Sequence, residues 1–156
     1  MAKVKIGDAP RRAEDARFIT GSGCYVDDIQ PENLAHAVVL RSPHAHADIR
    51  AIDTSDAATS PGVIAVLTGQ DLAAAGIGEL LPNERANIYS GEPFRYPTQY
   101  PLAKDRVRYV GDPVALVIAE SQAQAMDAAE RIVVDYATLP ATTTIAEAIE
   151  TDDTGN

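Results

Sequence analysis

The chain has 156 residues, of which 46% are hydrophobic and 23% charged, and its formal net charge is −10. A single domain of this length buries about 70% of its unfolded surface, so length and composition favour one globular domain over disorder. The acidic charge repels phosphate backbones and argues against nucleic-acid binding. No apolar run approaches the ~20 residues of a membrane-spanning helix, and the first residues lack a signal-peptide pattern. We therefore expect a cytoplasmic protein without a membrane span.

Residues 1–33 show no sustained hydrophobic periodicity and contain three glycines and two prolines. Such a pattern predicts an extended N-terminal arm with turns and at most short strands. Residues 25–28 in particular are expected to be extended.

From residue 34 onward, short strands alternate with short helices. The apolar patterns predict strands at 34–40, 47–52, 63–67, 113–119 and 132–136, and a short helix at 55–59. Thr68 with Asp71, and Ser121 with Gln124, have the spacing of helix N-terminal caps. Gly76 is expected to end the helix that follows Thr68.

The sheet expected from these elements has a clear centre. Residues 114–118 are apolar on both faces, which predicts a central strand in a sheet that is covered on both sides. Gly111 and Asp112 form a turn signal, so we expect residues 106–110 to make a hairpin with 114–118. The predicted fold class is α+β, with a mixed sheet and flanking helices.

Residues 76–105 contain four of the ten prolines and four of the eight aromatic residues. Loops without regular structure beyond ~12–15 residues are uncommon in compact domains. The aromatic residues of this Pro/aromatic loop need a covering surface. We predict that they form an interface with another part of a larger assembly; the alternative is a loop that folds back over its own sheet. These residues are Tyr89, Phe94, Tyr96 and Tyr100.

The glycines and acidic residues near the N-terminus do not form a recognisable active site. Gly21-Ser22-Gly23 lacks the third glycine of a dinucleotide fingerprint, because residue 26 is valine. Asp27 and Asp28 would point to opposite faces of an extended segment, so a turn or capping role is expected. Cys24 is the only cysteine and is interpreted as an inert thiol.

The three histidines offer a further hypothesis. His36, His44 and His46 could supply three nitrogen ligands to zinc, which would suggest a small metal-dependent hydrolase. No fourth ligand stands at a suitable spacing, and surface or channel-lining histidines are the favoured interpretation. We assign no catalytic, cofactor-binding or metal-binding residue.

A series of motifs spread over residues 8–141 resembles a known domain. The motifs lie at residues 12–28, 41–47, 61–63, 101–103, 107–115 and 135–140. Their order and spacing are similar to those of the N-terminal α/β hammerhead domain of molybdenum hydroxylase large subunits. This is the xanthine dehydrogenase and aldehyde oxidase family, and the chain most resembles its carbon monoxide dehydrogenase-type members.

The resemblance implies a non-catalytic structural or interface domain of an oxidoreductase that works at molybdenum held by molybdopterin. It implies Fe–S clusters and FAD on partner subunits, and a molybdopterin-binding region downstream of this segment. The expected organisation is an arm at 1–33, the hammerhead domain at 34–141 and a linker at 142–156. No cofactor is expected on this chain itself, and the isolated chain is expected to be inactive. The alternative is a free-standing binding or assembly module that docks on a separate catalytic subunit.

Overall fold

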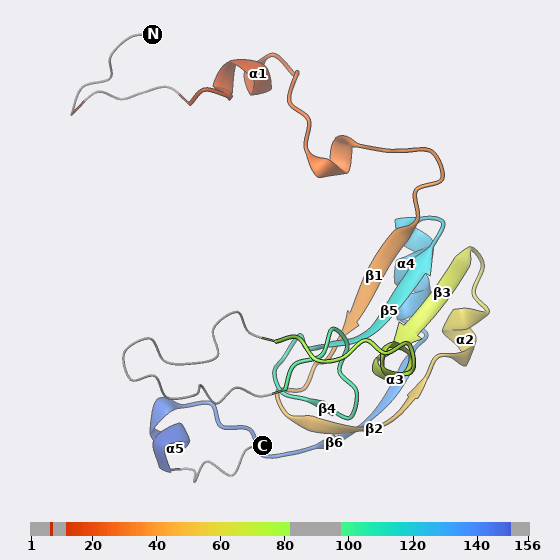
Figure 1. The fold of residues 1–156 in the computed structure, drawn as a ribbon, viewed down its shortest axis with the longest axis vertical. Helices are drawn as coiled ribbons and strands as arrows, with labels where there is room; N and C mark the ends of the chain where they lie inside the picture. The colour runs from red at the N-terminus through yellow and green to blue at the C-terminus, as the bar shows by residue number, and fades with distance from the viewer. Residues whose placement is uncertain (1–6, 8–11, 82–97, 151–156) are drawn as a thin grey trace. The chain divides into compact units, whose positions relative to one another are not determined.

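The computed structural model describes residue 7, residues 12–81 and residues 98–150. The chain divides into two compact units, Met1–Leu34 and Ala35–Asn156 (Figure 1). The expected division into arm, domain and linker stays a prediction.

The described part of the first unit contains two short helical segments, α1 (Asp15–Ile19) and the 3-10 helix η1 (Val26–Asp28). The ring of Phe18 stacks on that of Tyr25 at 5.3 Å between centroids. The backbone N–H of Tyr25 donates to the Asp28 carboxylate at 2.8 Å, which closes the turn. The backbone of Tyr25 is extended as predicted, but residues 26–28 form the 3-10 helix instead, and the capping role expected for the acidic pair is confirmed for Asp28.

The second unit contains a three-stranded antiparallel sheet with the order β1-β5-β3. Its strands are β1 (His36–Arg41), β5 (Pro113–Ala119) and β3 (Val63–Thr68). The central position predicted for the strand within residues 113–119 is confirmed. Pro113 is the first residue of its strand, where a proline removes no interior ladder hydrogen bond.

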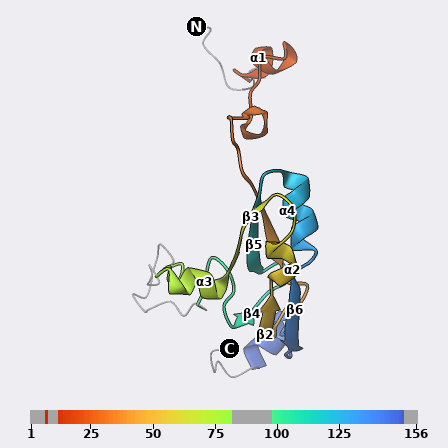
Figure 2. The ribbon, with the colours of Figure 1, turned by 90° about the vertical axis from the view of Figure 1, so that its right-hand side faces the viewer.

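Two helices, α2 (Ser55–Ala58) and α4 (Gln122–Ala129), lie on one side of this sheet (Figure 2). Small side chains let α4 approach the sheet closely. The core between them contains Ala57, Ala115, Val117, Ala119, Ala125, Ala128, Ala129 and Ile132. Ala125, Ala128 and Ala129 therefore form the face of α4 that packs into this core.

A second three-stranded sheet has the order β4-β2-β6 and is also antiparallel. Its strands are β4 (Arg106–Val107), β2 (Ala47–Asp53) and β6 (Val133–Thr138). A second core of Ala47, Ala103, Val107 and Val114 lies beside it. The α+β class is confirmed, but the expected mixed sheet is replaced by two antiparallel sheets. β5 inserts between β1 and β3, so these two strands of like direction never pair.

The predicted hairpin between residues 106–110 and 114–118 is wrong. β4 pairs with β2, while β5 pairs with β1 and β3. The turn itself exists, because Asp112 N–H donates to the Tyr109 carbonyl at 3.1 Å and Gly111 has φ +92°. The Asp112 carboxylate accepts the N–H of Arg108, and Ala103 N–H donates to the carbonyl of Pro113 at 2.6 Å. Local strand pairing across the turn is therefore replaced by these other partners.

The predicted helix caps are largely confirmed. Thr68 caps α3 (Gly69–Ala74) by accepting the N–H of Asp71, whose carboxylate accepts the N–H of Thr68 at 2.7 Å. Gly76 follows the helix end with φ +78°. Ser121 Oγ accepts the N–H of Gln124. In a complete capping box the Gln124 side chain would also accept the backbone N–H of Ser121. Here the Gln124 side chain accepts instead from the Ser121 hydroxyl at 2.7 Å.

The described parts of the predicted Pro/aromatic loop, residues 76–81 and 98–105, contain no helix or strand. A last short helix, α5 (Ile145–Glu150), lies within the range expected to be a linker. In the described ranges, no helix has both the length and the apolar character needed to cross a membrane.

Candidate interface site at the junction of the two sheets

Three segments that are distant in the sequence meet where the two sheets of the second unit join. They are the β1–β2 connection at 42–46, the turn at 108–112 before β5, and the end of β6 with the residues after it. All three belong to the motifs on which the family resemblance depends. The fold therefore gathers these motifs into one place.

Ser42 is the centre of this junction and is only 2% exposed. Its N–H donates to the Asp112 carbonyl at 2.9 Å, and its carbonyl accepts the N–H of Gly111 at 2.8 Å. The Arg41 guanidinium adds a hydrogen bond to the Gly111 carbonyl at 2.9 Å. These contacts fix the turn before β5 against the end of β1.

The Asp112 carboxylate is buried at this turn, where the residue is 8% exposed. It accepts the N–H of Arg108 at 3.0 Å. Burial and the neighbouring Asp112 carboxylate, which also hydrogen-bonds its hydroxyl, raise the pKa of Tyr109. Burial likewise raises the pKa of Tyr136, against a hydrogen bond with Ser42 that lowers it. Both phenols therefore stay neutral at physiological pH and act as hydrogen-bonding groups.

The histidines are divided between different surroundings. His44 contacts the ring of Tyr136 edge-on at 4.9 Å, and His46 Nδ1 donates to the Pro140 carbonyl at 2.7 Å. The buried Nε2 of His46 has no hydrogen-bond partner among the described residues. His36 begins β1, and no set of three His, Cys, Asp or Glu side chains in the described ranges is arranged to hold a metal. The zinc hypothesis therefore gains no support from the described geometry.

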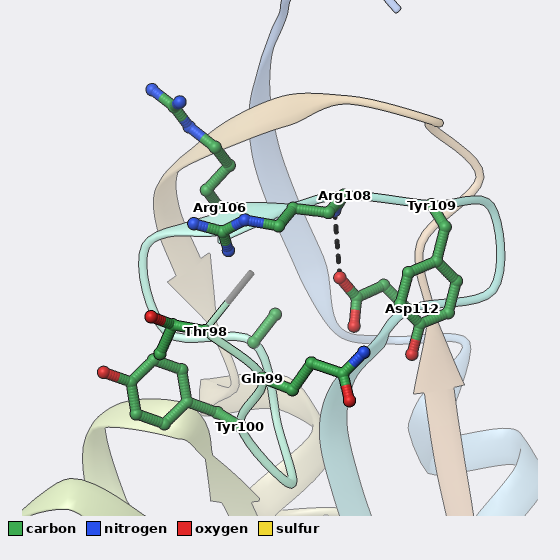
Figure 3. A pocket seen from close by; sticks show the side chains of 8 residues that line it. Thr98, Gln99, Tyr100, Arg106, Arg108, Tyr109 and Asp112 are labelled. Atoms are coloured by element: carbon green, nitrogen blue, oxygen red, sulfur yellow. Dashed lines mark hydrogen bonds between the residues drawn. The ribbon is translucent and has the colours of Figure 1, made fainter. Parts of the chain in front are cut away.

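A pocket of about 150 Å³ opens beside the junction (Figure 3). In Figure 3 the Gln99 amide points toward Asp112 and Tyr109, and the Arg108 side chain runs across the opening. Arg106 is paired through Nε to Asp48 Oδ1 at 2.6 Å. The pocket is lined by Thr98, Gln99, Tyr100, Ala103, Arg106, Arg108, Tyr109 and Asp112. Its volume lies below the ~300–1,000 Å³ that is typical of small-molecule and cofactor sites.

Of the four predicted interface residues, the structure places one. Tyr100 lines the pocket and is partly buried. Tyr89, Phe94 and Tyr96 lie outside the described residues. Their interface role stays a prediction.

Cys24 and Ser22 lie in the first unit. The thiol of Cys24 is exposed and is 3.8 Å from the Tyr25 carbonyl, and Ser22 lies near the hydroxyl of Thr20 at 3.4 Å. A catalytic thiol or hydroxyl needs a general base within hydrogen-bonding distance, and neither of these contacts provides one.

Sequence reasoning missed the roles of Ser42 and Asp112. In the sequence both residues stand out only as members of longer motifs, and the Gly111-Asp112 pair predicts a hairpin turn. The available signal was a short polar residue at each end of apolar strands, next to a proline in both cases. That pattern indicates strand termination, but it does not identify the partner segment.

Comparison with known proteins assigns this architecture. Residues 20–140 match the family described as aldehyde oxidase and xanthine dehydrogenase, a/b hammerhead domain. The chain belongs to this family. This chain, called the hammerhead chain below, also matches solved structures, so both its sequence and its fold support the assignment.

Two relatives of known activity illustrate the match. The hammerhead chain is 46% identical over 129 residues to the nicotine 6-hydroxylase large subunit of Paenarthrobacter nicotinovorans, covering 81% of this chain and 15% of that protein. It is 37% identical over 147 residues to the carbon monoxide dehydrogenase large chain of Afipia carboxidovorans, covering 94% of this chain and 17% of that protein. Among solved structures, quinoline 2-oxidoreductase from Pseudomonas putida 86 aligns with a TM-score of 0.79 at 38% identity, covering 99% of this chain and 19% of that one.

The hammerhead chain thus spans about a sixth of the length of these relatives. One of the similar solved structures is a Cu,Mo carbon monoxide dehydrogenase, and another relative is the gamma subunit of the 6-hydroxypseudooxynicotine dehydrogenase complex of Paenarthrobacter nicotinovorans.

Proposed function

We propose that this chain is a non-catalytic structural and interface domain of a molybdopterin-dependent oxidoreductase of the xanthine, aldehyde or carbon monoxide dehydrogenase type. The observation that carries the proposal is the pattern of coverage. The match takes in 81–99% of this chain but only 15–19% of each relative described above. A segment of that kind is one domain of a longer polypeptide, with the arm at 1–33, the hammerhead domain at 34–141 and a linker at 142–156.

The described residues do not fit a molybdopterin site. The pocket beside the junction has a volume of about 150 Å³, and one of its two arginines is already paired with Asp48. The Asp112 carboxylate that lines it would repel the phosphate of a pterin cofactor. We therefore propose that molybdopterin binds in another part of the longer protein. The family resemblance further supports the proposal that Fe–S clusters and FAD are carried by partner subunits and that the enzyme works in the cytoplasm.

The junction of the two sheets holds the segments that meet there in fixed positions. Its hydrogen bonds hold the β1–β2 connection against the turn before β5, and Tyr109 and Tyr100 lie at its surface. A rigid junction can hold the Pro/aromatic loop in position against a neighbouring domain or subunit. We propose that Tyr89, Phe94, Tyr96 and Tyr100 make those contacts.

The test is cofactor content of the 156-residue chain produced in a host that makes molybdopterin. The expected result is a folded chain without molybdenum and without dehydrogenase activity, because the cofactor site lies elsewhere. Stoichiometric molybdenum or pterin retained by the purified chain would contradict the proposal.

A further inference from the structure

The two faces of the sheet β1-β5-β3 differ in what covers them. Residues that pair directly across antiparallel strands project on the same face. Val117 pairs with Val38 and Val66 on the face that packs against α4. The pairs formed by Leu116 and Ile118 define the opposite face. That face, called here the open face, consists of Ala37, Val39, Ala65, Leu67, Leu116 and Ile118.

Burial along β5 follows this division. Ala115, Val117 and Ala119 are completely buried under α4, whereas Leu116 and Ile118 keep part of their surface exposed. In the part of the chain that the structure describes, no open-face residue packs against either hydrophobic core. Figure 2 shows α4 and α2 on one side of the sheet, with α3 leaving the other side at the end of β3.

An open face of this composition is unusual for a sheet in water. Antiparallel sheets that face solvent carry polar residues on that side, but all six open-face residues are apolar. Single exposed apolar side chains are common, whereas a contiguous apolar patch marks an interaction surface. The central strand thus has the composition of a strand covered on both sides.

We propose that the open face docks an apolar surface from the part of the longer polypeptide that lies outside residues 1–156. This inference rests on the proposed function. More than four fifths of each relative described above lies outside the match. A surface tethered in the same polypeptide has a high effective concentration, which favours it over a partner that must diffuse in.

A second copy of this chain fits the open face less well. The chain has a net charge of −10, and the acidic excess lies in residues 51–156. Two such surfaces repel each other, so an association based on the open face would work against charge. An apolar surface within the same polypeptide does not bring together two copies of this acidic chain, so its docking does not have to overcome that repulsion.

The experiment places a photo-crosslinking residue, p-benzoylphenylalanine, at Ala37 in the intact product of the native gene. Ala37 is exposed at the edge of the open face, so a larger side chain fits there. The matched control is the same residue at Val133, which is 67% exposed on the other sheet. After illumination, peptide mapping identifies the partner, and the intact mass of the gene product is recorded.

Cross-links from position 37 to peptides of the same polypeptide beyond residues 1–156, absent from position 133, are expected. Cross-links to residues 1–34, to residues 82–97 or to a second copy, or no specific cross-link, would overturn the docking inference. If the docking inference fails in this way but the gene product is much heavier than 16.5 kDa, the proposed function still stands. A product of about 16.5 kDa overturns both.

A second measurement tests whether the face is open in the 156-residue chain. An apolar-surface dye such as ANS is expected to bind, and Val39→Thr with Ile118→Thr should reduce its fluorescence at least twofold. The control Val133→Thr replaces an exposed valine on the other sheet and should leave the signal nearly unchanged. Equal dye fluorescence for the double variant and the parent would contradict an open face.

Discussion

Ser42 and Asp112, which are far apart in the sequence, are joined backbone to backbone at the junction of the two sheets. Ser42 N–H donates to the Asp112 carbonyl at 2.9 Å, and the adjacent Gly111 N–H returns a bond of 2.8 Å to the Ser42 carbonyl. This link explains why the turn before β5 fails to form a hairpin. It also gives the family motifs around both residues a physical role in holding the junction.

Removing the buried carboxylate tests the junction. Asp112→Ala leaves the N–H of Arg108 and the Tyr109 hydroxyl without their acceptor. We expect a loss of about 1–3 kcal/mol in the free energy of unfolding, measured by urea denaturation. Asp127→Ala on the exposed surface of α4 is the control and should stay within about 0.5 kcal/mol of the parent. Equal stability of the two variants would show that the junction contributes little.

Gly69 tests the contact between α3 and the segment that carries Tyr100. A Cβ atom at Gly69 would lie 2.5 Å from the Ala103 carbonyl oxygen and 2.9 Å from that of Leu102. Because both atoms belong to backbone, Gly69→Ala is expected to destabilise the chain by about 1–3 kcal/mol, despite the better helix propensity of alanine. Gly78→Ala is the matched control, since nothing lies within 4 Å of its Cβ position. The melting temperatures of both variants decide the comparison.

The cap of α3 predicts a pH dependence. Hydrogen bonds from the Thr68 hydroxyl and the Thr68 N–H lower the pKa of Asp71 below its usual 3.8. The cap therefore contributes stability above pH 3.8, and this contribution is lost as pH falls toward the lowered pKa.

Thr68→Ala should cost about 1 kcal/mol at neutral pH. The difference from the parent should shrink as the pH falls below 3.8, as followed by urea unfolding across the acid range. A difference that stays constant with pH would exclude the Asp71 carboxylate as the cause.

The proposed interface predicts a difference in proteolysis. If residues 76–105 contact a neighbouring domain, trypsin should cut the 156-residue chain at Arg85 and Arg95 faster than the longer native protein. Mass spectrometry of time points identifies the cleavage sites. Resistance of this range in the 156-residue chain would instead favour a loop that covers its own sheet.

The sequence predicts those features that depend on neighbouring residues. The Thr68 cap, the end of its helix at Gly76 and the apolar central strand all follow from local spacing. The partner of the Gly111-Asp112 turn does not, because Ser42 is brought there only by the pairing of β1 with β5.

For the candidate site and the open face, too, local spacing predicts individual elements but not what lies against them. Apolarity on both faces of β5 correctly predicted a central strand, but it could not tell which face this chain covers. α4 covers the face of Val117, and the open face of Leu116 is visible only in the structure. Likewise, the spacing of the histidines could not show that His46 binds the Pro140 carbonyl.

The most direct test of the account is made on the native protein, isolated from its source cells with an antibody against this segment. Its intact mass and its molybdenum, iron and flavin contents are measured together. The proposed function predicts a polypeptide several times heavier than 16.5 kDa that carries molybdenum, with iron and flavin on associated subunits. A native chain of about 16.5 kDa without these cofactors would contradict it and favour a free-standing module.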